Sequence, residues 1–426
     1  MSQYADILKE ELLTALGCTE PIAIALVASR FADALQEEPE EIIVRCSGNI
    51  IKNVKSVIVP NTAGLKGIEA AALAGVISKN WQNGLEVLNN FSDADRKKLQ
   101  ELLARHIVKV EHLQSPAVLH IIIEGRSKNN TAYAELIHSH TNIVKVMRNG
   151  TILSEKSFTT DEAKPAGVDR SCLNIKDILQ FADTVDLSKV ESLIKHQEKL
   201  NMNIATEGFK ALPEKSIAKV IYRNAKKSDG ENFKAISKAK IALAAAIEAR
   251  MTGLSFPVVS NSGSGNQGLC VSIPVVIFAD EHKLNEEKKI RALVASNLIA
   301  NHQKTGIGKL SAYCGAVSAT TAAMAGIAYM FGYDYDTVCK TISNSLATIS
   351  GMVCDGAKVS CASKAIAALD VAYLSYSMAI ADVDFHSGDG IVKCDVEKTI
   401  TAVGTLAKQG MKTTDDVLLQ IMLEEK

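Results

Sequence analysis

The sequence has no excess of charge of either sign. Its 426 residues include 47 Lys and Arg and 48 Asp and Glu, which leaves a formal net charge of −1. Proteins that bind nucleic acid or an anionic membrane surface usually concentrate basic residues on one face. The charge balance therefore argues against a nucleic acid and against a membrane surface as the partner of this protein.

The N-terminal segment lacks the features of an export signal. Residues Met1–Asp6 contain no basic stretch and no apolar stretch. We therefore expect a cytoplasmic protein in a reducing compartment. The nine cysteines are odd in number and scattered, so they do not form a disulfide framework. In a reducing compartment, clustered cysteines more often serve metal binding or catalysis.

Long hydrophobic runs of membrane-spanning character are also missing. Residues 315–332 carry no charge, but most of them are Ala, Ser, Thr or Gly. Small residues suit a helix that packs tightly inside a protein better than one that faces lipid. We interpret this run as a buried core helix. No convincing internal repeat or low-complexity tract is present.

The spacing of apolar residues predicts an α+β fold in two domains, because the chain exceeds the usual size of a single domain. The N-terminal part mixes strand-like alternation with helical spacing. The expected strands are residues 41–46, 54–59, 107–112, 118–124, 131–137, 143–147 and 151–154. The expected helices are residues 7–16, 19–35, 66–77 and 93–103.

From residue 175 onward nearly every segment has helical spacing. The expected helices are 175–184, 187–199, 201–211, 213–223, 232–250, 286–302, 315–331, 335–346, 362–381, 395–407 and 413–424. A charged segment with Pro and Gly, residues 159–170, is typical of a linker. We therefore expect an α+β domain over residues 1–158 and an all-α domain over residues 171–426.

Cys18 lies where one helix is expected to end, at Gly17, and the next to begin, at Thr19. Thr is a favourable N-cap, and Pro21 fits the first turn of a helix. The partial positive charge at a helix N-terminus favours a thiolate and lowers a thiol pKa. Cys18 is therefore a candidate reactive thiol, and a loop cysteine without a role is the alternative.

Three further cysteines lie in the helical half. Cys354 and Cys361 are seven residues apart, and Cys314 lies forty residues before Cys354. On a straight helix, seven residues would separate two thiols by about 10 Å, too far to hold one small metal cluster. Gly351 and Gly356 permit a bend, because glycine accepts positive φ. The alternative is three buried cysteines that act as small hydrophobic residues.

A polar, glycine-rich stretch covers residues 260–268. Gly263, Gly265 and Gly268 satisfy the dinucleotide-binding pattern G-x-G-x-x-G, but we expect no helix directly after them and no βα units around them. We therefore reject a dinucleotide site. Successive backbone N–H groups in such a loop bind small anions, which include carboxylates and the phosphate of pyridoxal phosphate. A polar turn between helices is the alternative.

His138 and His140 flank Ser139, so on a strand both side chains would point to one face. A two-histidine metal pair is one interpretation. Polar residues at the end of a strand are the other, because no third ligand lies nearby in the sequence.

Taken together, these segments resemble the L-cysteine desulfidase family over essentially the whole chain. The helical half is similar to the α chain of bacterial iron–sulfur L-serine dehydratases. Besides the spacing of Cys314, Cys354 and Cys361, the resemblance rests on Gly-Cys-Thr-Glu-Pro at 17–21, Ser-Gly-Asn-Ile-Ile-Lys-Asn at 47–53, His-Thr-Asn-Ile at 140–143, Ser-Gly-Ser-Gly-Asn-Gln-Gly at 262–268, Glu-Lys-Thr-Ile at 397–400 and Gly-Met-Lys-Thr-Thr-Asp at 410–415. Asn61 departs from the pattern, since a glycine is expected after Pro60.

The resemblance implies an enzyme that eliminates sulfide from L-cysteine and yields ammonia and pyruvate. By the same resemblance, Cys314, Cys354 and Cys361 would hold a [4Fe–4S] cluster with one iron lacking a protein ligand, and Cys18 would remove the substrate α-proton. Our hypothesis for the substrate carboxylate is the loop made of Ser262, Gly263, Ser264, Gly265, Asn266 and Gln267. Further candidates for substrate contacts are Lys52, Asn53, Lys66 and His140.

Three other functions remain open at this point. The first is an L-serine or L-threonine dehydratase with the same cluster, since the sequence does not separate a hydroxyl from a thiol leaving group. The second is a pyridoxal-phosphate-dependent eliminase, and the third is a thiol-rich protein without enzymatic activity. A homo-oligomer is also left open.

Overall fold

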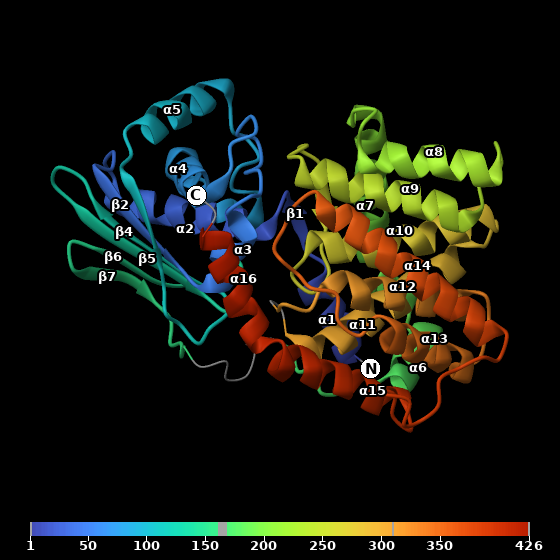
Figure 1. Cartoon of the computed structure of the whole chain (residues 1–426). Coiled ribbons are helices and arrows are strands. Elements are labelled where there is room, and N and C mark those ends of the chain that lie inside the picture. The colour runs from blue at the N-terminus through green and yellow to red at the C-terminus, as the bar shows by residue number, and fades with distance from the viewer. Residues whose placement is uncertain (1, 161–167, 309–310, 425–426) are drawn as a thin grey trace.

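The computed structural model describes residues 2–160, 168–308 and 311–424, and it contains two bodies that lie side by side (Figure 1). The body on the left is a β-sheet with helices packed against it, which we call the sheet body. The body on the right consists almost entirely of helices, and we call it the helical body. The expected α+β class, with the sheet in the N-terminal part and helices after it, is confirmed.

The sheet body is built on six strands in the order β3-β2-β4-β5-β6-β7. Among these strands β2 and β3 run parallel and the other neighbours pair antiparallel. Alternate residues of β2 are buried, as expected for a strand with one face on a core. The strands are β2 (Glu41–Cys46), β3 (Val108–His112), β4 (His120–Arg126), β5 (Thr131–Ile137), β6 (Ile143–Arg148) and β7 (Thr151–Glu155).

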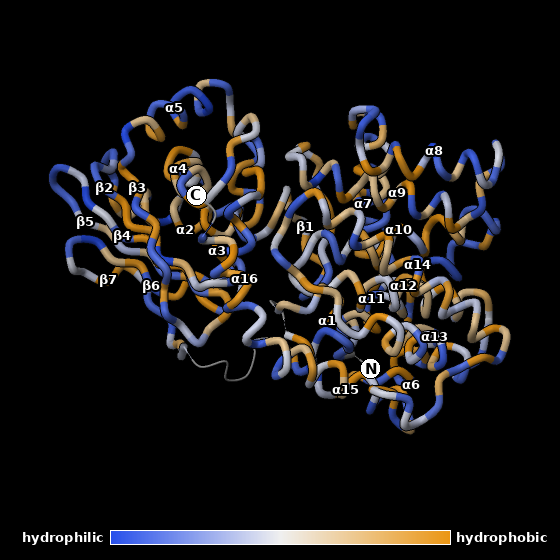
Figure 2. The backbone as a smooth tube through the Cα atoms, in the orientation of Figure 1, coloured by the Kyte–Doolittle hydropathy of each residue, from blue (hydrophilic) through white to orange (hydrophobic). Residues whose placement is uncertain are grey.

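Two apolar helices fill the core of the sheet body. α2 (Thr19–Leu35) is buried along nearly its whole length and packs against β4, β5 and β6, while α4 (Gly67–Ser78) packs on α2. Figure 2 shows hydrophobic stretches along these helices and the adjacent strands, while α5 is mainly hydrophilic. The other helices of this body are α3 (Gly48–Val54), η1 (Trp81–Glu86) and α5 (Asp93–Ala104).

The helical body surrounds α12, whose small residues allow four other helices, α10, α11, α13 and α14, to pack against it. The expectation of a buried core helix over this segment is confirmed. No helix within the described ranges has both the length and the apolar character to cross a membrane. The helices are α6 (Ile175–Thr184), η2 (Leu187–Lys189), α7 (Glu191–Ala211), α8 (Ile217–Asp229), α9 (Ala235–Met251), α10 (Gly265–Glu281), α11 (Glu286–Ile307), α12 (Gly315–Met330), α13 (Tyr335–Thr348), α14 (Ser360–Ile380), α15 (Val396–Thr405) and η3 (Leu406–Gly410).

Both ends of the chain cross from one body to the other. α1 (Ser2–Glu11) contributes to the core of the helical body, and β1 (Thr14–Leu16) pairs with β8 (Pro257–Val259) there. At the other end, α16 (Lys412–Glu424) leaves the helical body and packs on α3 of the sheet body. The division into residues 1–158 and 171–426 remains a proposal about folding units. Of the expected linker, residues 161–167 lie outside the described residues.

Several local expectations are wrong because distant partners decide the local structure. The expected strand at 54–59 is absent, and the chain before it forms α3, whose apolar side chains are buried at helical spacing. The first helix stops at Glu11, because Leu16 and its neighbours pair with β8 instead. The expected break near residue 200 is also absent. Asn201 lies inside α7, where its side chain donates to the Val259 and Gly268 carbonyls.

The close packing of α2 on α4 leads to a testable stability effect. A Cβ atom on Gly75 would collide with the backbone carbonyl of Ala25. We expect Gly75→Ala to lower the free energy of unfolding by about 1–3 kcal/mol, the usual cost of overpacking a core. Denaturant unfolding measures this loss. Gly351→Ala is the matched control, since nothing lies within 4 Å of a Cβ built there. Equal stability of the two variants would contradict this account of the α2–α4 contact.

Candidate active site at the junction of the two bodies

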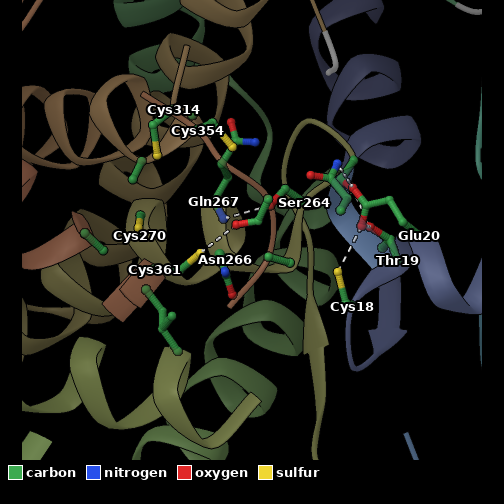
Figure 3. Close-up of a pocket in the computed structure, with 18 of the residues that line it drawn as sticks. Cys18, Thr19, Glu20, Ser264, Asn266, Gln267, Cys270, Cys314, Cys354 and Cys361 are labelled. Atoms are coloured by element: carbon green, nitrogen blue, oxygen red, sulfur yellow. Dashed lines mark hydrogen bonds between the residues drawn. The ribbon is translucent and has the colours of Figure 1, made fainter. Parts of the chain in front are cut away.

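A cavity lies at the junction of the two bodies (Figure 3). Its lining includes Cys18, part of the glycine-rich loop and the three cysteines of the helical half. Its volume of about 110 Å³ is small beside the roughly 300–1,000 Å³ of pockets for drug-sized ligands, so it suits a small molecule. The polar and thiol side chains that line it are Cys18, Thr19, Glu20, Asn53, Arg250, Ser264, Asn266, Gln267, Cys270, Lys304, Ser311, Tyr313, Cys314, Cys354 and Cys361.

Cys18 is the N-cap residue of α2, and its thiol is 4% exposed. The Sγ atom donates a hydrogen bond of 2.9 Å to Oε2 of Glu20, as Figure 3 shows. Burial raises the pKa of the Cys18 thiol well above its ordinary value, and the negative charge of Glu20 raises it further, while Arg250 acts in the opposite direction. The lowered pKa expected from the helix N-terminus is therefore wrong, because burial and the neighbouring carboxylate outweigh the helix dipole.

Glu20 is a site residue that sequence reasoning missed. Its side chain is buried and accepts hydrogen bonds from Cys18, from the Thr19 hydroxyl at 3.0 Å and from the Asn53 amide at 3.2 Å. The Thr19 hydroxyl also lies 3.2 Å from the Gly263 carbonyl. Glu20 thus joins α2 to α3, and Thr19 beside it contacts the glycine-rich loop. An acidic residue two positions after Cys18 was the available signal.

The glycine-rich loop opens a helix that was not expected from the sequence. Ser264 caps α10, and its side chain accepts a hydrogen bond from the Gln267 backbone N–H. The N-terminus of α10 therefore faces the cavity, where its partial positive charge favours an anion. Of the expected loop residues, Gly263, Ser264, Asn266 and Gln267 line the cavity. Ser262 does not, because its hydroxyl bonds Asn261 and Asn301.

Gly265 also lies outside the lining, and its role is to make room for Arg250. A Cβ atom on Gly265 would lie 2.5 Å from Cζ of Arg250. The buried guanidinium donates to Oδ1 of Asn266 at 2.8 Å and to the carbonyl of Gly17. Burial lowers the pKa of Arg250, while Cys18 and Glu20 oppose that shift. Sequence reasoning missed this residue, since an Arg at the end of a helix carries no distinctive pattern.

The three cysteines of the helical half all line this cavity. Cys314 and Cys354 lie on two short segments that pair antiparallel, with their backbone N–H groups donating to Met352 and Ala312 at 2.8 and 2.7 Å. Their side chains act on each other's pKa. Cys361 lies in the first turn of α14 and donates to the Gly356 carbonyl at 3.7 Å.

The bend expected between Cys354 and Cys361 is present at Gly356. Its φ is +95°, and a Cβ atom there would collide with the backbone carbonyl of Lys52. Only glycine fits a turn with this φ and this close contact. Gly351, the other expected hinge, is not among the residues with positive φ. The cysteine segment thus rests directly on α3 of the sheet body.

The three thiols line one cavity but are not grouped to hold a single metal ion. Within residues 2–160, 168–308 and 311–424, no three His, Cys, Asp or Glu side chains are grouped to hold one metal ion. The neighbouring Cys314 thiol lowers the pKa of Cys354, with help from Lys52 and Lys304, although burial opposes the shift. Cys354 and burial raise the pKa of Cys314. Lys304 is buried, and its pKa falls to about 8.

The remaining candidates for substrate contacts are divided between the cavity and its surroundings. Asn53 lines the cavity, while Lys52 is paired with Asp415 of α16. His140 is buried against the loop, with its Cε1 atom 3.5 Å from a Cβ built on Gly263. Lys66 is exposed. His138 has positive φ, and its ring bonds the Thr159 carbonyl, so the two histidines do not share a strand face.

Comparison with known proteins places the chain in a family. The family model described as the serine dehydratase alpha chain matches residues 82–420. A UPF0597 protein of Treponema denticola is 51% identical over 423 residues, which cover 99% of this chain and 98% of the relative. A UPF0597 protein of Lachnoclostridium phytofermentans is 44% identical, and the match covers 98% of this chain and 98% of the relative. A UPF0597 protein of Finegoldia magna is 43% identical, and the match covers 100% of each. This chain therefore belongs to the serine dehydratase alpha chain family.

Proposed function

We propose that this protein is an L-cysteine desulfidase, a carbon–sulfur lyase that depends on a [4Fe–4S] cluster held by Cys314, Cys354 and Cys361. The observation that supports the proposal most strongly is that these three thiols line the same small cavity as Cys18. The guanidinium of Arg250, a positive charge, lines that cavity too. Membership of a family named for a dehydratase supports elimination chemistry.

The donor set suits such a cluster. Iron–sulfur clusters are held by cysteine thiolates. A [4Fe–4S] cluster does not need three thiolates on one ion, because each thiolate binds a separate iron. Two buried lysines, Lys52 and Lys304, act on the Cys354 thiol and favour its negative form. When bound, the cluster supplies a Lewis-acidic iron with an open position for the sulfur of the substrate.

The chain's own residues would bind and orient the amino acid. Arg250, Asn266 and the N-terminus of α10 form the part of the cavity that favours the α-carboxylate. Cys18, on the side of the sheet body, would remove the α-proton. Sulfide leaves, and the released aminoacrylate hydrolyses to pyruvate and ammonia.

L-serine dehydration is the second candidate, because the matching family model carries that name. The same cavity would hold L-serine, which differs from L-cysteine in one atom. Carboxylate binding and α-proton removal would be the same for both substrates.

If Cys314, Cys354 and Cys361 hold the cluster, replacing one of them should lower the iron content, while replacing a cysteine outside the cavity should not. We expect Cys354→Ala to lose most of its iron and acid-labile sulfide when purified anaerobically, because one thiolate ligand is gone. Cys339→Ala is the control, since Cys339 is a half-buried cysteine of α13 outside the cavity lining. Full iron content in Cys354→Ala would contradict the ligand assignment.

The two candidate substrates can be separated directly. We expect the anaerobic protein to release sulfide and pyruvate from L-cysteine in equal amounts, and to release pyruvate from L-serine with a lower kcat/KM. A higher kcat/KM with L-serine would make the protein a serine dehydratase. Release of neither product would exclude both activities.

The carboxylate role of Arg250 predicts an effect on KM. In Arg250→Lys the charge stays, but the planar fork that reaches Asn266 and Gly17 is lost. We expect KM for the amino acid to rise by about 10-fold or more, which corresponds to roughly 1.4 kcal/mol of binding. Arg223→Lys on the exposed face of α8 is the matched control. An unchanged KM in a folded Arg250→Lys variant would contradict the assignment.

A further inference from the structure

The hydrogen bond from Cys18 to Glu20 raises a question about proton removal. A thiol accepts the substrate α-proton only if its own proton has a place to go. Cys18 is buried, and its proton points at Oε2 of Glu20 at 2.9 Å. The nearest proton acceptor is therefore a carboxylate of the same helix turn.

Glu20 is placed to receive that proton. Its two oxygens accept from three donors, Cys18, Thr19 and Asn53, a pattern that suits an ionised carboxylate because such a group is an acceptor only. The carboxylate is 8% exposed, so its position is fixed by the protein and not by solvent. The other charged group that acts on Cys18 is Arg250 of α9, whose guanidinium bonds the carbonyl of Gly17.

We propose that Glu20 takes the proton that Cys18 gives up, so that the substrate α-proton is removed through a Cys18–Glu20 relay. The proposal rests on the proposed function, because it needs a substrate with an acidic Cα–H bond. Glu20 acts through Cys18 and touches no atom of the substrate, so it is a positioning residue.

The relay balances in atoms and electrons. The Cα–H bond of the substrate breaks and a new S–H bond forms at Cys18, while the original S–H bond breaks and an O–H bond forms at Glu20. The electron pair of the Cα–H bond becomes the Cα=Cβ double bond, and the Cβ–S bond breaks with its pair on the departing sulfide. Glu20 later passes its proton to the product or to water.

Glu20 also has a structural alternative, which any test has to separate from the relay. Its bond to Asn53 connects α2 to α3, and its bond to Thr19 holds the hydroxyl that also lies near the Gly263 carbonyl of the loop. A purely structural Glu20 would lower activity when replaced, but it would leave the pH dependence and the reactivity of the Cys18 thiol unchanged.

Glu20→Gln keeps the size of the side chain and removes its charge. In this variant the proton of Cys18 must go to water, so we expect kcat at pH 7 to fall by about 100-fold, within the usual contribution of acid–base catalysis. We also expect kcat of this variant to increase as the pH rises, because more of the Cys18 thiol is then deprotonated. Glu20→Asp, which keeps a carboxylate, should restore part of the rate.

The second measurement needs no substrate. Iodoacetamide alkylation of the Cys18 peptide, followed by mass spectrometry in the anaerobic full-length protein, should be several times faster in Glu20→Gln at pH 8, because a like charge no longer opposes the thiolate. Alkylation of Cys46, which is buried in β2, is the internal control for loosening of the structure. It should stay slow in both proteins.

The two measurements have distinct outcomes. Slower turnover with faster Cys18 alkylation supports the relay. Wild-type kcat with an unchanged pH profile in Glu20→Gln overturns it, and so does slower turnover with unchanged alkylation of Cys18. An inactive wild-type protein would instead overturn the proposed function, and alkylation would then still report whether Glu20 controls the Cys18 proton.

Discussion

A buried positive charge holds together the two sides of the candidate site. The Arg250 guanidinium binds the backbone carbonyl of Gly17, just before Cys18, and the side chain of Asn266 in the glycine-rich loop. A buried charge without hydrogen-bond partners costs free energy. The contacts with Gly17 and Asn266 offset that cost for the Arg250 guanidinium. This side chain therefore helps to fix the turn that carries Cys18 relative to the loop that opens α10, together with the Thr19 hydroxyl near the Gly263 carbonyl.

The placement of the chain ends reinforces this junction. α1 and β1 belong to the helical body, so the chain enters the sheet body at Cys18 itself. At the other side, the turn at Gly356 packs on the backbone of α3, which brings the cysteine segment to the same boundary. Residues far apart in the sequence thus meet because the chain passes between the bodies at these points.

Local patterns in the sequence predicted the fold class and most elements, because alternation and helical spacing report burial directly. The bend at Gly356 could also be predicted, since its position between two cysteines required one. The bonds of Glu20 to Asn53 and of Arg250 to Gly17 could not, because each joins residues more than thirty positions apart. The predicted direction of the Cys18 pKa shift was wrong because the sequence shows a helix N-terminus and a nearby acidic residue, but neither the burial of the thiol nor its hydrogen bond to Glu20.

The last helix, α16, contacts the part of the sheet body that holds the Cys18 turn. α16 packs on α3 through Leu419, which lies against Gly48, and through the ion pair of Asp415 with Lys52. The next residue of α3, Asn53, holds the carboxylate that bonds Cys18. A displacement of α16 would therefore shift α3, and through Asn53 and Glu20 it would change the surroundings of the Cys18 thiol.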